Sequence, residues 1–204
     1  SQDGESLRYT FDGSTQTLPV ETKIAGGGLF GTPGTDQVQV TGTSDPVTLL
    51  TYSSASVRSA FGGVGYVGIE TPLAELPTRQ VTFTGRWSGK AFSTDGVPVG
   101  SGILDGDLTI LVDFDDGTVS GTFSSDVTTG AVLGLAGTVS GTVSGNVISG
   151  SMDVTSESYS GSMPIAARAF GFDGGTLAGA FSGTITENGT SDSFATSGTF
   201  NLND

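Results

Sequence analysis

Residues 137–145 read Gly-Thr-Val-Ser-Gly-Thr-Val-Ser-Gly, with glycine and valine at odd positions and threonine and serine at even positions. Successive side chains of a β-strand point to opposite faces. The stretch therefore predicts a strand with one small apolar face and one hydroxyl-bearing face.

The same alternation recurs along the chain, and there it sets large apolar side chains beside glycines. In residues 82–91 the odd positions hold Phe83, Gly85, Trp87, Gly89 and Ala91, and residues 118–124, 177–185 and 194–202 follow the same pattern. A small barrel fills its interior by alternating small and large inward residues, and glycine lets strands coil sharply. A sandwich also fits alternation, but repeated Gly/Phe pairing favours a closed barrel.

Turn signals divide the second part of the chain into eight expected strands. Asp115-Asp116-Gly117, Gly145-Asn146 and Asn188-Gly189 are hairpin sequences, because these residue types tolerate positive φ. The fold class is thus an all-β chain with an eight-stranded antiparallel β-barrel. Its strands are expected at 80–92, 106–114, 117–124, 134–144, 147–154, 160–170, 175–187 and 191–202.

The first part of the chain has shorter apolar runs, interrupted by glycine-rich stretches at residues 26–28 and 31–34. These runs predict a small β-rich domain, joined to the barrel near Pro72–Pro77. The expected domains are residues 1–78 and 79–204.

Composition excludes several classes of function. The 204 residues carry 21 acidic and 7 basic side chains, a net charge of −14, and contain neither cysteine nor histidine. Cysteine-ligated zinc, iron–sulfur clusters, thiol nucleophiles and histidine-based catalysis are therefore ruled out. The acidity disfavours nucleic acid and anionic membranes as partners, and no apolar run is long enough for a spanning helix. We expect a protein that is not an enzyme and holds no metal.

Three segments in order resemble one family. They are Tyr66-Val-Gly-Ile-Glu-Thr with Pro77 and Val81-Thr-Phe-Thr-Gly-Arg-Trp-Ser-Gly; Val112-Asp-Phe-Asp-Asp-Gly-Thr-Val-Ser-Gly-Thr-Phe; and Phe170-Gly-Phe-Asp-Gly-Gly-Thr-Leu-Ala-Gly-Ala-Phe-Ser-Gly. Together they resemble the β-barrel domain of transferrin-binding protein B and related Gram-negative surface lipoproteins. The resemblance covers roughly residues 64–204; residues 1–63 have no counterpart, there is one lobe, and the lipid-bearing cysteine is missing.

The resemblance implies a handle and a barrel that bind a host protein or haem through handle and loops. It implies iron or haem acquisition or host-factor binding, at an extracellular or outer-membrane location, with a lipid anchor outside this sequence. A start at Ser1 without methionine fits an exported chain. The alternative is a structural or adhesive surface protein without a small ligand. A third interpretation is a hydrophobic small molecule held in the barrel lumen.

The candidate ligand-binding residues are Tyr52, Arg58, Phe61 and Tyr66, which cluster around glycines near the expected junction. Aromatic and arginine side chains are favoured at binding hot spots. Without histidine, an axial haem ligand would have to be tyrosine or methionine. The alternative is that Phe61 and Tyr66 pack in the core of the junction.

Three further patterns have simpler explanations. Asp113, Asp115 and Asp116 faintly match a calcium loop but lack its spacing, so we expect a solvated turn, and we interpret Asp105 and Asp107 likewise. Asn188-Gly189-Thr190 matches the N-glycosylation pattern, but an Asn-Gly turn explains it. A packed core is expected rather than a ligand pocket from the inward aromatic residues Phe83, Trp87, Phe114, Phe123, Phe181 and Phe200.

Overall fold

The computed structural model divides into two compact units, residues 1–67 and 68–204, which are described separately. The first unit is described by its strand backbones, at residues 6–11, 14–24, 27–31, 36–44, 47–55 and 60–67. The second unit is described with its side chains, at residues 68–94, 102–126, 133–171 and 173–204.

The first unit is a six-stranded sheet in which the strands follow chain order, β1-β2-β3-β4-β5-β6. The expected β-rich handle is therefore confirmed at the level of the backbone. Strand β3 was not foreseen, because glycine is depleted in strands and its segment was interpreted as a loop. The strands are β1 Ser6–Phe11, β2 Ser14–Ile24, β3 Gly27–Gly31, β4 Asp36–Ser44, β5 Val47–Ala55 and β6 Ala60–Gly68.

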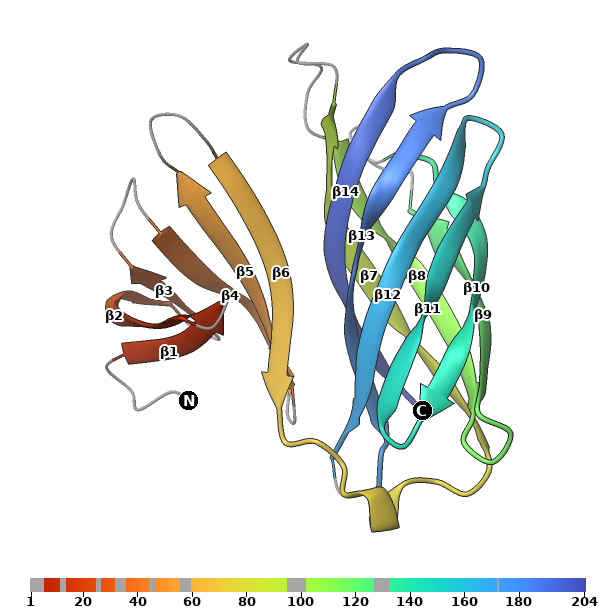
Figure 1. Cartoon of the computed structure of the whole chain (residues 1–204), viewed down its shortest axis with the longest axis horizontal. Coiled ribbons are helices and arrows are strands. Elements are labelled where there is room, and N and C mark those ends of the chain that lie inside the picture. The colour runs from red at the N-terminus through yellow and green to blue at the C-terminus, as the bar shows by residue number, and fades with distance from the viewer. Residues whose placement is uncertain are drawn as a thin grey trace. The chain divides into compact units, whose positions relative to one another are not determined.

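The second unit is a closed barrel of eight antiparallel strands, as the sequence predicted (Figure 1). Each strand pairs with the next along the chain, and the last strand pairs with the first, where Phe200 lies opposite Trp87. The strands are β7 Gln80–Ser93, β8 Gly102–Asp113, β9 Thr118–Ser125, β10 Ala136–Ser144, β11 Val147–Thr155, β12 Tyr159–Phe170, β13 Thr176–Glu187 and β14 Ser193–Asn203.

Two details of the barrel that we predicted from the sequence were wrong. Strand β8 begins at Gly102 rather than at residue 106, because Gly102 already pairs with Ala91 of β7. Asp105 and Asp107 therefore lie within a strand and not in a solvated turn. Phe114 lies in the turn after β8 and is only partly buried, packed against the core.

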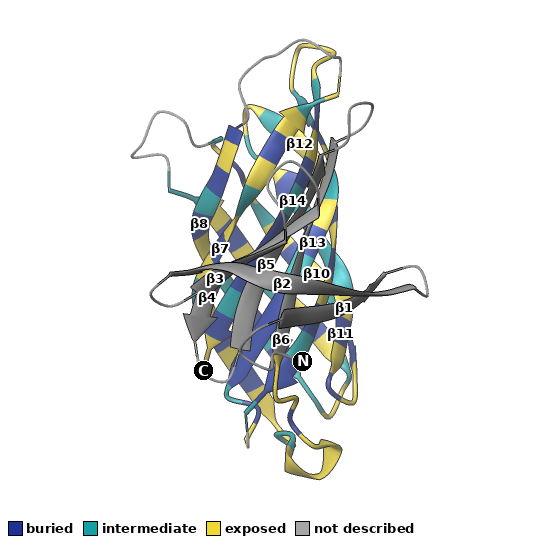
Figure 2. Cartoon of the chain, turned by 90° about the vertical axis from the view of Figure 1, so that its left-hand side faces the viewer, coloured by how far each residue is buried: buried dark blue, intermediate teal, exposed yellow. Residues whose placement is uncertain are grey.

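The barrel interior is filled by side chains. Buried and exposed residues alternate along the strands (Figure 2), as period-two patterning requires. Trp87 is fully buried, with its ring edge-on to Phe123 and Phe181 at centroid separations of 5.5 and 5.6 Å. The predicted packed core is confirmed for Phe83, Trp87, Phe123, Phe181 and Phe200, all of them buried.

Glycine and phenylalanine face each other across β13 and β14 in a reciprocal way. Gly179 lies opposite Phe200, and Phe181 lies opposite Gly198. A β-carbon on Gly179 would meet the ring of Phe200, and one on Gly198 would meet the ring of Phe181. The glycines at these positions therefore supply the space in which the two rings lie.

A connector, residues 69–79, leads into β7 and contains the single-turn 3-10 helix η1 (Leu73–Glu75). Thr71 is buried; its backbone N–H donates to the carbonyl of Ala169 at 3.1 Å, and its hydroxyl donates to that of Gly171 at 2.8 Å. Arg168 on β12 donates to Glu70 Oε2 at 3.0 Å. The connector thus belongs to the barrel unit in its contacts, whereas the domain boundary after residue 78 stays a prediction.

Within the described ranges, the structure contains no helix with the length and apolar character needed to span a bilayer.

Candidate functional site

The candidate residues from the sequence fall in the first unit. Tyr52 lies on β5, and Phe61 and Tyr66 lie on the neighbouring strand β6. Their side chains, and Arg58 altogether, lie outside the described residues. The backbone therefore brings three of the four onto adjacent strands, and their role in binding stays a prediction.

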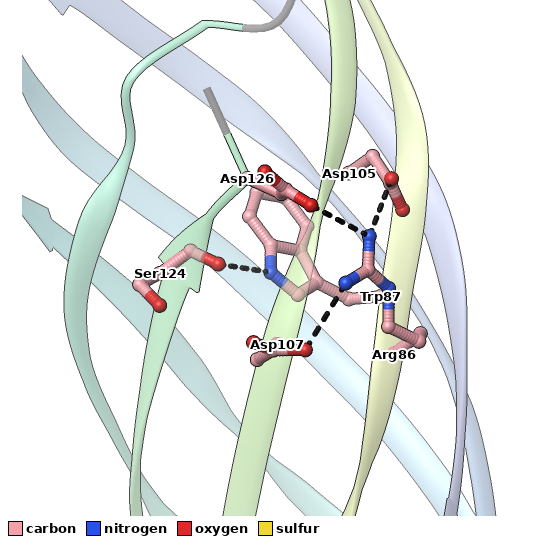
Figure 3. A network of polar contacts seen from close by, with 6 residues as sticks. All are labelled: Arg86, Trp87, Asp105, Asp107, Ser124 and Asp126. Atoms are coloured by element: carbon pink, nitrogen blue, oxygen red, sulfur yellow. Dashed lines mark hydrogen bonds and ion pairs between the residues drawn. The ribbon is translucent and has the colours of Figure 1, made fainter. Parts of the chain in front are cut away.

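A polar cluster lies on the outer face of the barrel, where β7 runs beside β8 (Figure 3). The register places Arg86 opposite Asp107 and Ser88 opposite Asp105. The Arg86 guanidinium donates to Asp105 Oδ2 at 2.6 Å and to Asp107 Oδ1 at 3.1 Å, and it lies 3.9 Å from Asp126 Oδ2. Three carboxylates thus surround one cation.

The electrostatics of this cluster leave negative charge on the surface. The hydrogen bond to Asp105 is the main cause that raises the pKa of Arg86 above its ordinary value, with smaller contributions from the charge of Asp105 and from Asp107. The three aspartate side chains are 39–76% exposed, so solvent and solutes reach them. One guanidinium cannot neutralise three carboxylates, so these four side chains together carry a net negative charge.

Two large apolar side chains are exposed on the same face. Phe92 is 51% exposed and Ile103 is 45% exposed. Ile103 lies opposite Lys90, two residues before Phe92 on β7, so Phe92 and Ile103 are diagonal cross-strand neighbours. We call the surface formed by Arg86, Lys90, Phe92, Ile103, Asp105 and Asp107 the β7–β8 face.

The β7–β8 face is carried by a rigid support. Trp87 points inward from between the outward side chains, and its indole N–H donates to the carbonyl of Ser124 on β9 at 3.3 Å (Figure 3). Because neighbouring strands hold the exposed groups in register, the sheet fixes their relative positions. Sequence reasoning missed this site because Asp105-Gly106-Asp107 looks like turn chemistry, and the alternation from Ile103 to Asp107 was the available signal.

The turn between β8 and β9 is confirmed as a solvated hairpin tip. Asp113 Oδ1 accepts the backbone N–H groups of Asp115 at 3.1 Å and Asp116 at 3.0 Å, and Gly117 has φ of 70°. The Asp113 side chain thus caps its own turn. Within the part of the chain that the structure describes, no group of three or more histidine, cysteine or acidic side chains is arranged so that it could hold a metal ion.

Comparisons with known proteins agree with this architecture. No protein-family model and no curated protein matches the sequence. Solved structures do match: a variant of transferrin binding protein B from Haemophilus parasuis Hp5 has a TM-score of 0.61 at 12% identity, over 100% of this chain and 42% of that chain. A double variant of that protein gives a TM-score of 0.62 at 12% identity, with the same coverage.

The isotype 1 transferrin binding protein B from serogroup B Neisseria meningitidis gives a TM-score of 0.61 at 15% identity, over 97% of this chain and 39% of that chain. This chain therefore spans about two fifths of the length of these proteins. Such identities establish a shared fold and nothing finer. The sheet followed by an eight-stranded barrel is thus the fold of part of transferrin binding protein B.

Proposed function

We propose that this chain is a non-enzymatic binding protein of the extracellular or outer-membrane surface, which takes part in iron or haem acquisition or in host-factor binding. The observation that carries the proposal is the fold, which this chain shares over nearly its whole length with proteins named for binding transferrin. The absence of histidine and cysteine from the sequence also supports a role other than catalysis.

A protein is the partner that the described residues favour. The barrel interior is occupied by its own side chains, so a ligand meets the outside of the barrel, the loops or the handle. The β7–β8 face combines exposed apolar groups with charged groups of both signs, Arg86 and Lys90 beside Asp105 and Asp107. Such a surface suits a partner that presents an apolar residue among charged or polar groups. Tyr52, Arg58, Phe61 and Tyr66 are the proposed contacts from the handle.

Haem is the less favoured ligand of the two. The sequence has only two methionines, and both Met152 and Met163 are fully buried in the barrel core. Haem ligation by methionine would require the barrel to open, which leaves tyrosine as the axial ligand. Haem added to the folded chain would then give the absorption shift of a tyrosinate-ligated iron.

The decisive experiment measures binding of immobilised full chain to transferrin, iron-loaded and iron-free, and separately to haem. We expect transferrin to bind and the double variant F92S/I103S to weaken that binding. Thr138→Ala, at an exposed position on β10 away from the face, is the matched control and should bind normally. Transferrin binding that the double variant leaves unchanged would remove the β7–β8 face from the proposal. Failure of transferrin and of haem to bind would overturn the acquisition role.

A structural or adhesive role is the second candidate, and one observation favours it. Apart from Ala136, the outward positions of β9 and β10 are serine and threonine, and cross-strand pairs such as Ser120–Ser140 and Thr122–Thr138 place hydroxyls side by side. A broad uncharged hydroxyl surface suits lateral association with a matrix. An apparent molar mass from light scattering that rises with protein concentration at neutral pH would support this role. A chain that stays monomeric at all concentrations would count against it.

A further inference from the structure

The side chain of Asn188 joins two hairpins at one end of the barrel. The turns involved are the β11–β12 turn, residues 156–158, and the β13–β14 turn, residues 188–192. Asn188 Nδ2 donates to the carbonyls of Glu157 at 2.9 Å and Ser156 at 3.2 Å, while Asn188 Oδ1 accepts the hydroxyl of Ser160 at 2.8 Å. The backbone N–H of Asn188 donates to the carbonyl of Ser158 at 2.8 Å. Both donors and the carbonyl oxygen of this amide are therefore engaged with the neighbouring hairpin.

Asn188 is also followed by glycine, and it is the only asparagine in the sequence that is. Gly189 is exposed, has φ of 86°, and has nothing within 4 Å of the position where a β-carbon would stand. Glycine has no β-carbon, and no other atom crowds this residue on the side where a β-carbon would stand, so its backbone nitrogen is the least hindered kind of nucleophile for the side-chain carbonyl carbon of the residue before it.

We propose that Asn188 is a site of spontaneous deamidation, and that the reaction releases the contact between the two hairpins. The backbone nitrogen of Gly189 loses its proton to solvent and bonds to Cγ of Asn188. The bond from Cγ to Nδ2 breaks, and Nδ2 leaves as ammonia after taking a proton from water, which leaves a five-membered succinimide. Water then adds to either ring carbonyl and cleaves its bond to nitrogen, giving aspartate or isoaspartate. No oxidant, reductant or enzyme is needed.

The product cannot keep the contacts of the amide. A carboxylate would place a charged acceptor against the carbonyl oxygens of Ser156 and Glu157, where the amide had placed two donors. Carboxylates are already close in sequence at Glu187 and Asp192. Repulsion and two lost hydrogen bonds therefore act in the same direction, and the two hairpins separate.

The hydrogen bonds that the reaction breaks also set its pace. The side-chain amide must turn toward the nitrogen of Gly189, and its bonds to Ser156, Glu157 and Ser160 oppose that rotation. The native fold therefore slows deamidation relative to the unfolded chain, and removing one of these hydrogen bonds should make the reaction faster. The same two bonds to Nδ2 oppose N-glycosylation of the Asn188-Gly189-Thr190 pattern in the folded protein.

The test follows the mass of the peptide that contains residue 188 while the full chain is incubated at mildly alkaline pH. We expect deamidated and isoaspartyl peptide to accumulate, faster in denaturant than in buffer. Ser160→Ala, which removes one bond to the amide, should accelerate the reaction about fivefold. Ser140→Ala on β10 is the matched control and should react at the parent rate.

Three results would overturn the proposal: no deamidation in buffer while the denatured chain reacts fully, equal rates for the Ser160→Ala and Ser140→Ala variants, or a glycan mass on this peptide from the native source. The consequence is tested separately with Asn188→Asp, the product in its unrearranged form. Amide hydrogen exchange should become faster in residues 156–160 and 187–193 of this variant. Exchange equal to the parent chain would refute the release of the hairpins.

Discussion

At the scale of single residues, the packing of the barrel core depends on phenylalanine rings that lie directly against glycines, which have no β-carbon. Gly198 on β14 lies opposite Phe181 on the neighbouring strand β13, and a methyl group on Gly198 would overlap the ring of Phe181. We predict that Gly198→Ala lowers the free energy of unfolding by about 1–3 kcal/mol, the usual cost of overpacking a core. Urea denaturation followed by the fluorescence of Trp87, the single tryptophan, measures it.

The control for this prediction is Ser197→Ala, on the outward face of the same strand. Its midpoint should stay close to that of the parent chain, because Ser197 is only partly buried and lies outside the packed interior, where substitutions are nearly neutral. A Gly198→Ala midpoint equal to that of Ser197→Ala would show that the core has room to spare.

Tyr159 gives a residue-scale prediction on pH. Burial is the main cause that raises the pKa of Tyr159, and the charge of Glu187 adds to it. The folded chain therefore holds the phenol proton more tightly than the unfolded chain does. The resulting stabilisation is complete below the ordinary tyrosine value of about 10 and is lost as the pH rises through the folded pKa.

Difference absorbance between the parent chain and Tyr159→Phe isolates this titration from those of the other three tyrosines. Glu187→Gln should move the Tyr159 pKa part of the way down. A Tyr159 that titrates at the ordinary value in the folded chain would contradict the packing of its ring against Phe194, where the centroids lie 6.1 Å apart.

At the scale of elements, the hydrogen bonds of the connector, residues 69–79, bear on whether the barrel domain begins before or after it. Residues 69–71 bond to the end of β12, so a chain that begins at residue 79 loses these bonds while a chain that begins at residue 68 keeps them. Each such bond contributes roughly 0.5–1.5 kcal/mol net. We predict a lower thermal midpoint for residues 79–204 than for residues 68–204, measured by circular dichroism. Equal midpoints would favour the boundary after residue 78 that the sequence predicted.

Most elements of the barrel were predictable because alternation is a local signal. Trp87, Phe123 and Phe181 face inward as their odd positions required, and Gly145 and Gly189 form turns with positive φ. The start of β8 was missed because Asp105-Gly106 has turn chemistry, and its strand conformation depends on pairing with β7. Local signals cannot supply that partner.

The sites were less predictable than the elements. The ion pairs of Arg86 depend on which residue of β8 lies opposite, and the four bonds of Asn188 depend on two hairpins that meet at one end of a closed barrel. Register and closure are properties of the folded chain. Asn188 was rightly interpreted as a turn residue, but its contacts with Ser156 and Ser160 had no sequence signature.

At the scale of the whole molecule, the excess of carboxylates governs behaviour in solution. The net charge is −14 and the sequence isoelectric point is about 4.1. Like-charged molecules repel one another, and this repulsion vanishes at the isoelectric point. We predict a minimum of solubility near pH 4, seen as a maximum in light scattering. Scattering that is flat across this range would mean that hydration of the hydroxyl surface, rather than charge, keeps the chain dispersed.

The pairing of β14 with β7 has a consequence for how this module can be joined to other chains. The entry to the barrel at Gln80 and its exit at Asn203 lie on adjacent strands at the same end, since Thr84 is opposite Asn203. Neighbouring strands are only about 5 Å apart. A short peptide could therefore join Asn203 to Gln80, which would allow a circularly permuted barrel with new termini at another hairpin. For the same reason, the whole barrel could be inserted into a surface loop of an unrelated protein.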